Sequence, residues 1–347
     1  MRFKGINYDT GFISAGTTTR EPFDPDVVRR EMEIIHHDLH CDAVRITGGY
    51  PERLEIAAAC AAEAGLEVWF CPFTNNLTSE EFMALLPEFA DGAERVRTRG
   101  AEVVFLTGSE LSLMTAGILP GDTLADRAAS LADPHRLRPL IPGVRARISD
   151  LLCESVDAVR RRFGGKLSYA SIPLDGVDWT PFDIISTDAG YRTAQMAARF
   201  REGIRAFVAQ GRAQGKPVAI TEFGCAAHLG AADMASRGIS DVIEWDDRGR
   251  PLRLKGNPIR DEDEQARYVT ELLNVFDSEG VDSAFVYTFA RYDLVDSSEL
   301  REDFDRASAG IVRVLDGERR GRRYPDMPWE PKAVFTALAD YYRDLHR

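Results

Sequence analysis

Eight short apolar segments alternate with helical segments along the 347-residue chain, and this alternation constrains the fold more than any other feature. Apolar runs bounded by Gly, Pro or charged residues are typical of strands buried on both faces of a parallel sheet. The expected strands are 3–9, 43–47, 67–72, 102–107, 166–172, 182–187, 216–225 and 282–287. The expected helices are 26–39, 52–64, a helix from Ser79, about 145–163, about 194–214, 263–279 and about 330–345.

This alternation predicts an α/β protein that forms a single (β/α)8 barrel of the TIM-barrel type, not an open doubly wound sheet. No GxGxxG sequence follows the first expected strand, which removes the main support for a dinucleotide-binding fold. Barrels commonly reach this length as one domain, so we expect one over residues 1–347. Long loop excursions at about 112–143, 226–262 and 290–325 are expected over the C-terminal face, where long loops are usually functional.

Charge and composition limit the kinds of binding partner and the compartment that we expect. The formal net charge of −13 argues against nucleic acid or an anionic membrane surface as a partner. Neither a secretory signal nor a run long enough to span a bilayer is visible, and the five scattered cysteines never form a CxxC pair. We therefore expect a cytoplasmic protein with reduced thiols, and make no prediction of its oligomeric state.

Polar and aromatic residues at the strand exits are the candidate site, because barrel active sites lie at the C-terminal ends of the strands. The candidates are Asn7, Asp9, Arg45, Ser109, Glu110, Asp188, Tyr191, Glu222, Tyr287, Phe289 and Arg291, with Asn75, Asn76, Asp175 and Asp293 nearby in the sequence.

Two of these candidates are glutamates expected to stand nearly opposite each other across the mouth. Glu110 follows the fourth strand, and Glu222 lies in the seventh. Such a pair suits glycoside chemistry, in which one carboxylic acid protonates the leaving oxygen and the other carboxylate attacks the anomeric carbon. Arg45 beside Glu222 is expected to keep that carboxylate ionised. Glu110, flanked by Leu111 and Leu113, is expected to hold its proton longer.

Four short stretches carry a family resemblance. They are Val-Arg-Ile at 44–46, Phe-Leu-Thr-Gly-Ser-Glu at 105–110, Phe-Asp-Ile-Ile-Ser-Thr-Asp-Ala-Gly-Tyr at 182–191 and Ile-Thr-Glu-Phe-Gly at 220–224. In this order along one chain they resemble the large clan of retaining (β/α)8 glycoside hydrolases. The resemblance implies Glu110 as general acid/base, Glu222 as nucleophile, and Arg45 and Tyr191 as partners of the nucleophile. The chain also resembles uncharacterised barrel proteins labelled as abortive-infection proteins, although none of these residues predicts a role in phage defence.

Two positions depart from the clan. Ser109 stands where the clan usually has an Asn that contacts the sugar 2-hydroxyl, and serine is too short to reach as far. Tyr287-Thr-Phe-Ala-Arg-Tyr292 stands where the clan often has a Trp platform. We expect one of Tyr287, Phe289 and Tyr292 to stack on a ligand.

Several of the candidate residues also suit a purely structural role. A glutamate at a strand exit also suits a helix N-cap neighbour or half of an ion pair, although the barrel rule favours a functional role for Glu222 and Glu110. Arg45 equally suits a structural ion pair, and Asp188 suits a cap for the helix that follows at least as well as a binding role. His36 and His40 are one helical turn apart but precede a strand, at the stability face of a barrel. We therefore predict no metal and no cofactor.

The sequence thus predicts a glycoside hydrolase-like enzyme that acts on a small glycoside or glycosylated metabolite by a retaining double displacement. Two alternatives stay open. One is a barrel enzyme that uses the same carboxylates as acid/base on a non-sugar natural product, and the other is a non-catalytic carbohydrate-binding barrel.

Overall fold

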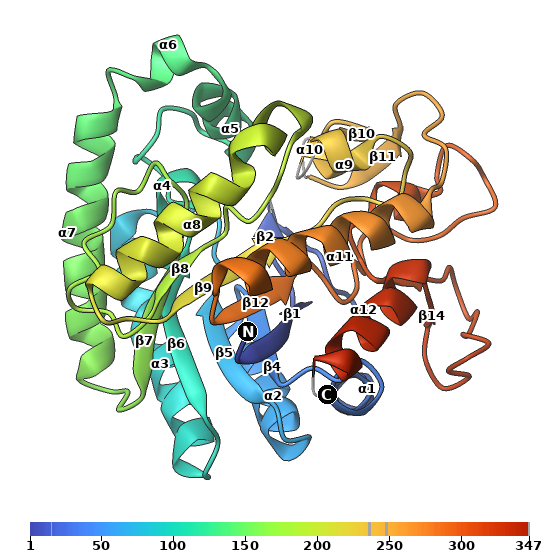
Figure 1. The fold of residues 1–347 in the computed structure, drawn as a ribbon, viewed down its shortest axis with the longest axis horizontal. Helices are drawn as coiled ribbons and strands as arrows, with labels where there is room; N and C mark the ends of the chain where they lie inside the picture. The colour runs from blue at the N-terminus through green and yellow to red at the C-terminus, as the bar shows by residue number, and fades with distance from the viewer. Residues whose placement is uncertain (15, 235–236, 247–248, 346–347) are drawn as a thin grey trace.

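The computed structural model of the chain describes residues 1–14, 16–234, 237–246 and 249–345. Its centre is a closed barrel of parallel strands, which confirms the predicted (β/α)8 fold (Figure 1). In order around the barrel the strands are β1 (Phe3–Asp9), β4 (Ala43–Gly48), β5 (Glu67–Pro72), β6 (Val103–Ser109), β7 (Lys166–Ser171), β8 (Ile185–Thr187), β9 (Val218–Phe223) and β12 (Ser283–Val286). Pairing of β12 with β1 closes the ring.

Helices cover the outside of the barrel. They are α1 (Pro25–His37), α2 (Pro51–Glu63), α3 (Ser79–Thr98), α7 (Ile141–Arg160), α8 (Ala197–Ala213), α11 (Glu262–Glu279) and α12 (Ala333–Asp344). Local sequence fixes their ends, as in α3, where Thr78 and Glu81 form a capping box. In the described part of the chain, every helix is too short or too polar to cross a bilayer.

Several predicted boundaries were wrong by two to four residues, including the start of α12 at residue 333 instead of about 330 and the bounds of β9, predicted as 216–225. Two of the differences have a visible cause. β8 begins at Ile185 instead of residue 182, because the N–H groups of Asp183 and Ile184 both turn to the Leu167 carbonyl, at 2.9 and 3.3 Å. α7 begins at residue 141 instead of about 145, because Pro142 is well suited to a first helical turn.

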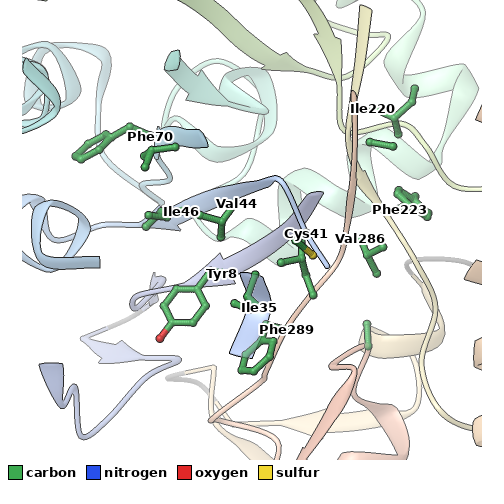
Figure 2. Close-up of a cluster of buried hydrophobic side chains, with 14 of the residues drawn as sticks. Tyr8, Ile35, Cys41, Val44, Ile46, Phe70, Ile220, Phe223, Val286 and Phe289 are labelled. Atoms are coloured by element: carbon green, nitrogen blue, oxygen red, sulfur yellow. The ribbon is translucent and has the colours of Figure 1, made fainter. Parts of the chain in front are cut away.

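The side chains of each barrel strand alternate between two cores, as the period of two in a strand requires. In β4, Val44 and Ile46 belong to the large core between barrel and helices, part of which Figure 2 shows. Ala43 belongs to a smaller cluster inside the barrel, and Arg45, two residues further on, is fully buried. The interior therefore ends in polar side chains at the C-terminal end of the strands.

The long excursions are folded. Residues 112–143 contain most of α4 (Leu111–Met114), then α5 (Leu124–Ala132) and α6 (Pro134–Leu137). Residues 226–262 contain α9 (Ala231–Met234), α10 (Arg237–Ser240), β10 (Ile243–Trp245) and β11 (Pro251–Leu254). Residues 290–325 contain η2 (Phe304–Ala307) and β13 (Val312–Val314), which pairs with β14 (Trp329–Pro331). Two further elements are a hairpin of β2 (Ile13–Ser14) and β3 (Thr17–Thr18), and η1 (Ala194–Met196) ahead of α8. In Figure 1, α5, α6 and the α9–β11 segment lie on the same, upper side.

Candidate active site

A β-bulge in β9 turns Glu222 toward the barrel axis. Ile220 pairs with Ala284, but Phe223 pairs with Val286, so β9 has one residue more than β12 over this stretch. Ile220 and Phe223 both lie in the outer core although they are three residues apart, which strict alternation forbids. Bulges next to active sites commonly re-aim a side chain in this way. Without the extra residue, Glu222 would face the helices.

A second bulge lies in β6, immediately before Glu110. Leu106 pairs with Ser168 and Ser109 with Ala170, so β6 also has one extra residue. Glu110 itself has φ 49° and ψ 40°, a left-handed conformation that is costly for a residue with a Cβ. Its N–H donates to the Ala170 carbonyl at 2.9 Å, which helps to hold this geometry. Strained residues held by their surroundings are concentrated at functional sites.

Arg45 lies inside the barrel and connects several strand ends. Its Nη1 donates to Asp188 Oδ1 at 3.0 Å, to Asn7 Oδ1 at 3.1 Å and to the Thr221 carbonyl at 3.0 Å, and its Nη2 lies 3.2 Å from Asp188 Oδ2. The Nη1 atom is also 3.5 Å from Glu222 Oε2. Arg45 therefore binds Asp188 through both carboxylate oxygens. Its contact with Glu222 is longer and comes from Nη1, which already has three other acceptors.

Asp188 has neither of the roles expected from the sequence. Its side chain is fully buried, so it is not open to a sugar, and the residue that caps the following η1 is Thr193. Ser109 is also turned inward, since its hydroxyl donates to Asp188 Oδ2 at 2.7 Å and accepts from Arg45 Nη2 at 2.9 Å. Both side chains support Arg45 from below the mouth. The same holds for Asn7, whose amide donates to the Thr221 carbonyl at 2.9 Å.

Glu222 lies at the mouth between Tyr191 and Arg45. Tyr191 Oη donates to Glu222 Oε1 at 2.7 Å, as the resemblance implied, and 13% of the Glu222 side chain stays exposed. Burial and the charge of Asp188 raise the pKa of Glu222 to about 7, against the lowering effects of Arg45 and Tyr191. The expectation that Arg45 keeps Glu222 ionised is therefore only partly right, because Asp188 already neutralises Arg45.

Glu110 lies in a different environment. Burial, followed by the charges of Asp188 and Glu222, raises the pKa of Glu110 well above its ordinary value. Within the described residues no side chain or N–H donates to the Glu110 carboxyl, whereas Glu222 has Tyr191 and Arg45. A donor stabilises a carboxylate anion. This difference in donors favours the proton on Glu110 over Glu222, which is the arrangement expected from the sequence.

Partly exposed polar side chains form the rim next to Glu222. Arg291 binds Asp293 through both carboxylate oxygens, at 2.7 and 2.6 Å, and its Nη1 donates to Tyr287 Oη at 3.3 Å. Asp9 accepts from the Gly11 N–H at 2.9 Å and from the Thr19 hydroxyl, and so holds the β2–β3 hairpin. Asp9, Tyr287 and Arg291 all retain some exposure.

The prediction that Phe289 is available for stacking is wrong. The Phe289 ring is fully buried in the outer core, 6.1 Å from the Tyr8 ring and 5.3 Å from the Trp329 ring (Figure 2). Tyr292 points to the same region, where its hydroxyl donates to Glu31 Oε1 at 2.6 Å. Of the three aromatic candidates, Tyr287 stays at the mouth.

Two supports of the mouth were not foreseen. Tyr169 Oη accepts from the Leu111 N–H at 2.8 Å and donates to Asp175 at 2.9 Å, which fixes the chain just after Glu110. Burial raises the pKa of Asp175 to about 6.

Arg127 in α5 is the second unforeseen support. It is buried and donates to Asn76 Oδ1 at 2.8 Å and to the Leu113 carbonyl at 2.6 Å, which ties the first excursion to the loop after β5. Neither Tyr169 nor Arg127 lies at a strand exit, so the rule that selected the candidates could not find them.

Two surface hollows lie at the other end of the barrel. The larger, about 420 Å³, is lined by Lys166 at the start of β7 and by Arg160, and the other, about 330 Å³, by Arg2 and Asp282 before β12. Arg160 pairs with Asp183 at 2.6 Å, and Arg2 with Asp282 at 2.9 Å. Because barrel chemistry is found at the opposite face, we assign the candidate site to the mouth around Glu110 and Glu222.

The comparisons with known proteins agree on the fold. The chain covers 98% of the GH113 beta-mannanase AaManA from Alicyclobacillus acidocaldarius over 99% of its own length, with 15% identity and a TM-score of 0.59. It also matches beta-glucuronidases from Parabacteroides merdae (14% identity, TM-score 0.54) and Ruminococcus gnavus (16% identity, TM-score 0.51), in each case over 99% of its own length. The chain spans 36% and 49% of these two longer proteins.

The fold is thus a (β/α)8 barrel, similar to that of the mannanase and to the matched parts of the two glucuronidases. No protein-family model matches the chain, and no curated protein matches its sequence.

Proposed function

We propose that this protein is a glycoside hydrolase-like enzyme that cleaves a small glycoside by a retaining double displacement. One observation carries the proposal. Glu222 is turned to the mouth by a bulge and held by Tyr191 and Arg45. Glu110 lies in the same electrostatic field, and none of the residues that the structure describes donates a hydrogen bond to its carboxyl group. A carboxylate with donors and a carboxylic acid without them are the two states that the reaction requires.

In the first half of the reaction, Glu222 acts as nucleophile. One of its oxygens forms a bond to the anomeric carbon as the bond from that carbon to the glycosidic oxygen breaks. Glu110 gives its proton to the departing oxygen, so the aglycone leaves as a neutral alcohol. Tyr191 and Arg45 orient the nucleophile and favour its anionic form. The product of this half is a glycosyl ester on Glu222.

In the second half, Glu110 acts as base. It removes a proton from a water molecule, the water oxygen bonds to the anomeric carbon, and the ester bond to Glu222 breaks. The sugar leaves with its original anomeric configuration, Glu222 is again a carboxylate, and Glu110 is again protonated. Turnover requires pH values at which Glu222 has lost its proton and Glu110 has kept it.

The fold likeness supports sugar chemistry but leaves the sugar open, because a mannanase and two glucuronidases are similar to this chain to nearly the same degree. Tyr287 is the aromatic side chain left to stack on a sugar ring at the mouth. The excursions with α4 to α6, and with α9 to β11, would form walls around it.

The test is turnover of a panel of aryl glycosides, with the anomeric configuration of the first-formed sugar followed by NMR. We expect retention, and we expect Glu222→Gln and Glu110→Gln to reduce kcat/KM for substrates with poor leaving groups. Azide should rescue Glu110→Gln with an activated aryl leaving group, because such a substrate needs no acid and azide needs no base. An inverted product, or full activity in Glu222→Gln, would refute the mechanism.

A second candidate is an acid/base reaction of the same carboxylates on a non-sugar natural product. It is favoured by Ser109, whose hydroxyl is occupied by Asp188 and Arg45 instead of being open to a sugar 2-hydroxyl. A chain that turns over none of the panel but binds small molecules through Glu110 and Glu222 would favour this candidate.

A further inference from the structure

Two arginines at the mouth, Arg45 and Arg291, are held by carboxylates of the chain itself. Arg45 binds the two oxygens of Asp188, and Arg291 binds the two oxygens of Asp293. Arginine recognises a carboxylate best through two parallel N–H groups. In both residues one such edge is already occupied. Arg45 is also fully buried, and the remaining nitrogen of Arg291, Nη1, donates to Tyr287 Oη at 3.3 Å, so a substrate carboxylate would have to compete with partners already bound.

The groups around the reacting position are mainly acidic. Tyr287 illustrates this, because its hydroxyl lies in the field of three carboxyl groups, those of Glu222, Asp9 and Asp293, and of one cation, Arg291. The carboxyl groups of the mouth are those of Asp9, Glu110, Asp175, Asp188, Glu222 and Asp293. The whole chain carries a formal net charge of −13, so its long-range field also repels anions. A desolvated anion needs a paired cation, and here it would meet uncompensated carboxylates instead.

We propose that the site accepts glycosides whose sugar carries no anionic group and rejects uronic acid glycosides, and that Asp293 determines this specificity by occupying Arg291. The inference rests on the proposed glycosidase function and adds the charge class of its substrate. Asp293 has this role because Arg291 is the rim cation that reaches Tyr287, at 3.3 Å. An Asn at position 293 would remove a negative charge and leave part of the Arg291 fork available.

The test compares substrates that share one leaving group. 4-Methylumbelliferyl glucoside, mannoside and galactoside are assayed beside 4-methylumbelliferyl glucuronide at fixed ionic strength. For the unmodified chain we expect kcat/KM for the glucuronide at least 100-fold below the best neutral substrate. In Asp293→Asn we expect this ratio to narrow by about 10-fold. Asp340→Asn, which breaks the exposed pair of Asp340 with Arg343 in α12, should leave the ratio unchanged.

A binding experiment covers the case in which Asp293→Asn does not fold. The unmodified protein is titrated calorimetrically with isofagomine and with uronic isofagomine, which differ by the carboxylate, and we expect the uronic form to bind at least 100-fold more weakly. Equal or preferred use of the glucuronide overturns the inference and leaves the glycosidase proposal standing. A glucuronide ratio unchanged in folded Asp293→Asn overturns the role of Asp293. Absence of turnover and of isofagomine binding overturns the inference together with the proposed function.

Discussion

Two groups of charged side chains in this barrel, each built on carboxyl groups that are largely buried, differ in how far their charges are compensated. The mouth cluster consists of Arg45 with the carboxyl groups of Glu110, Asp188 and Glu222. The loop cluster joins the second and third excursions. It consists of four carboxylates and five cations, namely Glu262, Asp296, Asp303 and Asp305 with Arg260, Arg306, Arg313, Arg319 and Lys332.

The different balance of charge changes the protonation of the carboxyl groups. In the loop cluster the pKa of Glu262 is lowered although burial opposes this, because Arg313 and the Ala333 N–H stabilise the anion. Burial raises the pKa of Asp305 in the same cluster, against the lowering effects of Lys332 and Arg260. In the mouth cluster, burial and Asp188 raise the pKa of Glu222 and of Glu110. A compensated cluster holds loops together, whereas an under-compensated one can take up and release protons. We therefore propose a structural role for the loop cluster and a chemical role for the mouth cluster.

The largest expected effect is on chemistry at the mouth. Glu222→Gln keeps the shape of the side chain but removes the nucleophile, so we expect kcat/KM to fall by about 10⁴-fold or more. Steady-state kinetics with the best aryl glycoside, together with circular dichroism to confirm folding, checks this. A loss of less than tenfold would show that Glu222 is a structural residue like those of the loop cluster.

The opposite pattern is expected in the loop cluster. Asp305→Asn leaves Lys332, which lies 2.8 Å from Asp305, without its buried counter-charge, and breaking a buried pair costs about 3–5 kcal/mol. We expect the free energy of unfolding to fall by that amount in urea titrations, with kcat/KM of the folded protein within about threefold of its original value. Asp340→Asn is the control and should cost about 1 kcal/mol or less. A large loss of activity in Asp305→Asn at unchanged stability would contradict the proposal that the two clusters have different roles.

The raised pKa of Glu222 has a consequence for stability. The folded protein binds a proton at Glu222 up to about pH 7, whereas the unfolded chain loses it near pH 4.5. The folded state therefore holds more protons in this window, and its stability falls as the pH rises through it. The contribution is on the order of 3 kcal/mol. Glu222→Gln should accordingly be as stable as the original chain at pH 5 and more stable at pH 8 in urea titrations, and equal stability at both values would contradict the shift.

The smallest expected effect concerns Asp188. Its charge raises the pKa of Glu222 and engages Arg45, so Asp188→Asn should lower that pKa and release Arg45 toward the nucleophile. In a plot of kcat/KM against pH, we expect the acidic limb, which reports the deprotonation of Glu222, to move to lower pH by about one unit. Ser109→Ala removes a neutral donor to Asp188 and should move the limb less. An unmoved limb in a folded, active Asp188→Asn would mean that Asp188 only supports the barrel.

Much of this molecule could be predicted from the order of apolar segments and from the strand-exit rule. That rule brought Glu222, Tyr191 and Arg45 to one place, and the structure has them in contact. It could not predict the bulges in β6 and β9, because one extra residue in a strand leaves no trace in its composition. Simple alternation would have turned Glu222 toward the helices.

The sequence also could not predict which of several possible side chains a candidate residue contacts. Carboxylates follow several of the expected strands, and the sequence does not say which of them Arg45 binds. The packing of β4 against β1 and the position of Asp188 inside the barrel decide this. Phe289 follows a strand exit, but its ring folds back between Tyr8 and Trp329, and Trp329 lies 40 residues later in the sequence. Such tertiary contacts are not visible in local periodicity.

The most direct measurement is covalent trapping of the nucleophile. The protein is incubated with an activated 2-deoxy-2-fluoro glycoside of the best neutral sugar, and the adduct is located by intact-mass and peptide mass spectrometry. We predict a mass increase of one fluoroglycosyl unit on the peptide that contains Glu222, at full occupancy and with loss of activity. An adduct on another residue, or continued turnover with inversion and no adduct, would contradict the assignment of Glu222 as the nucleophile.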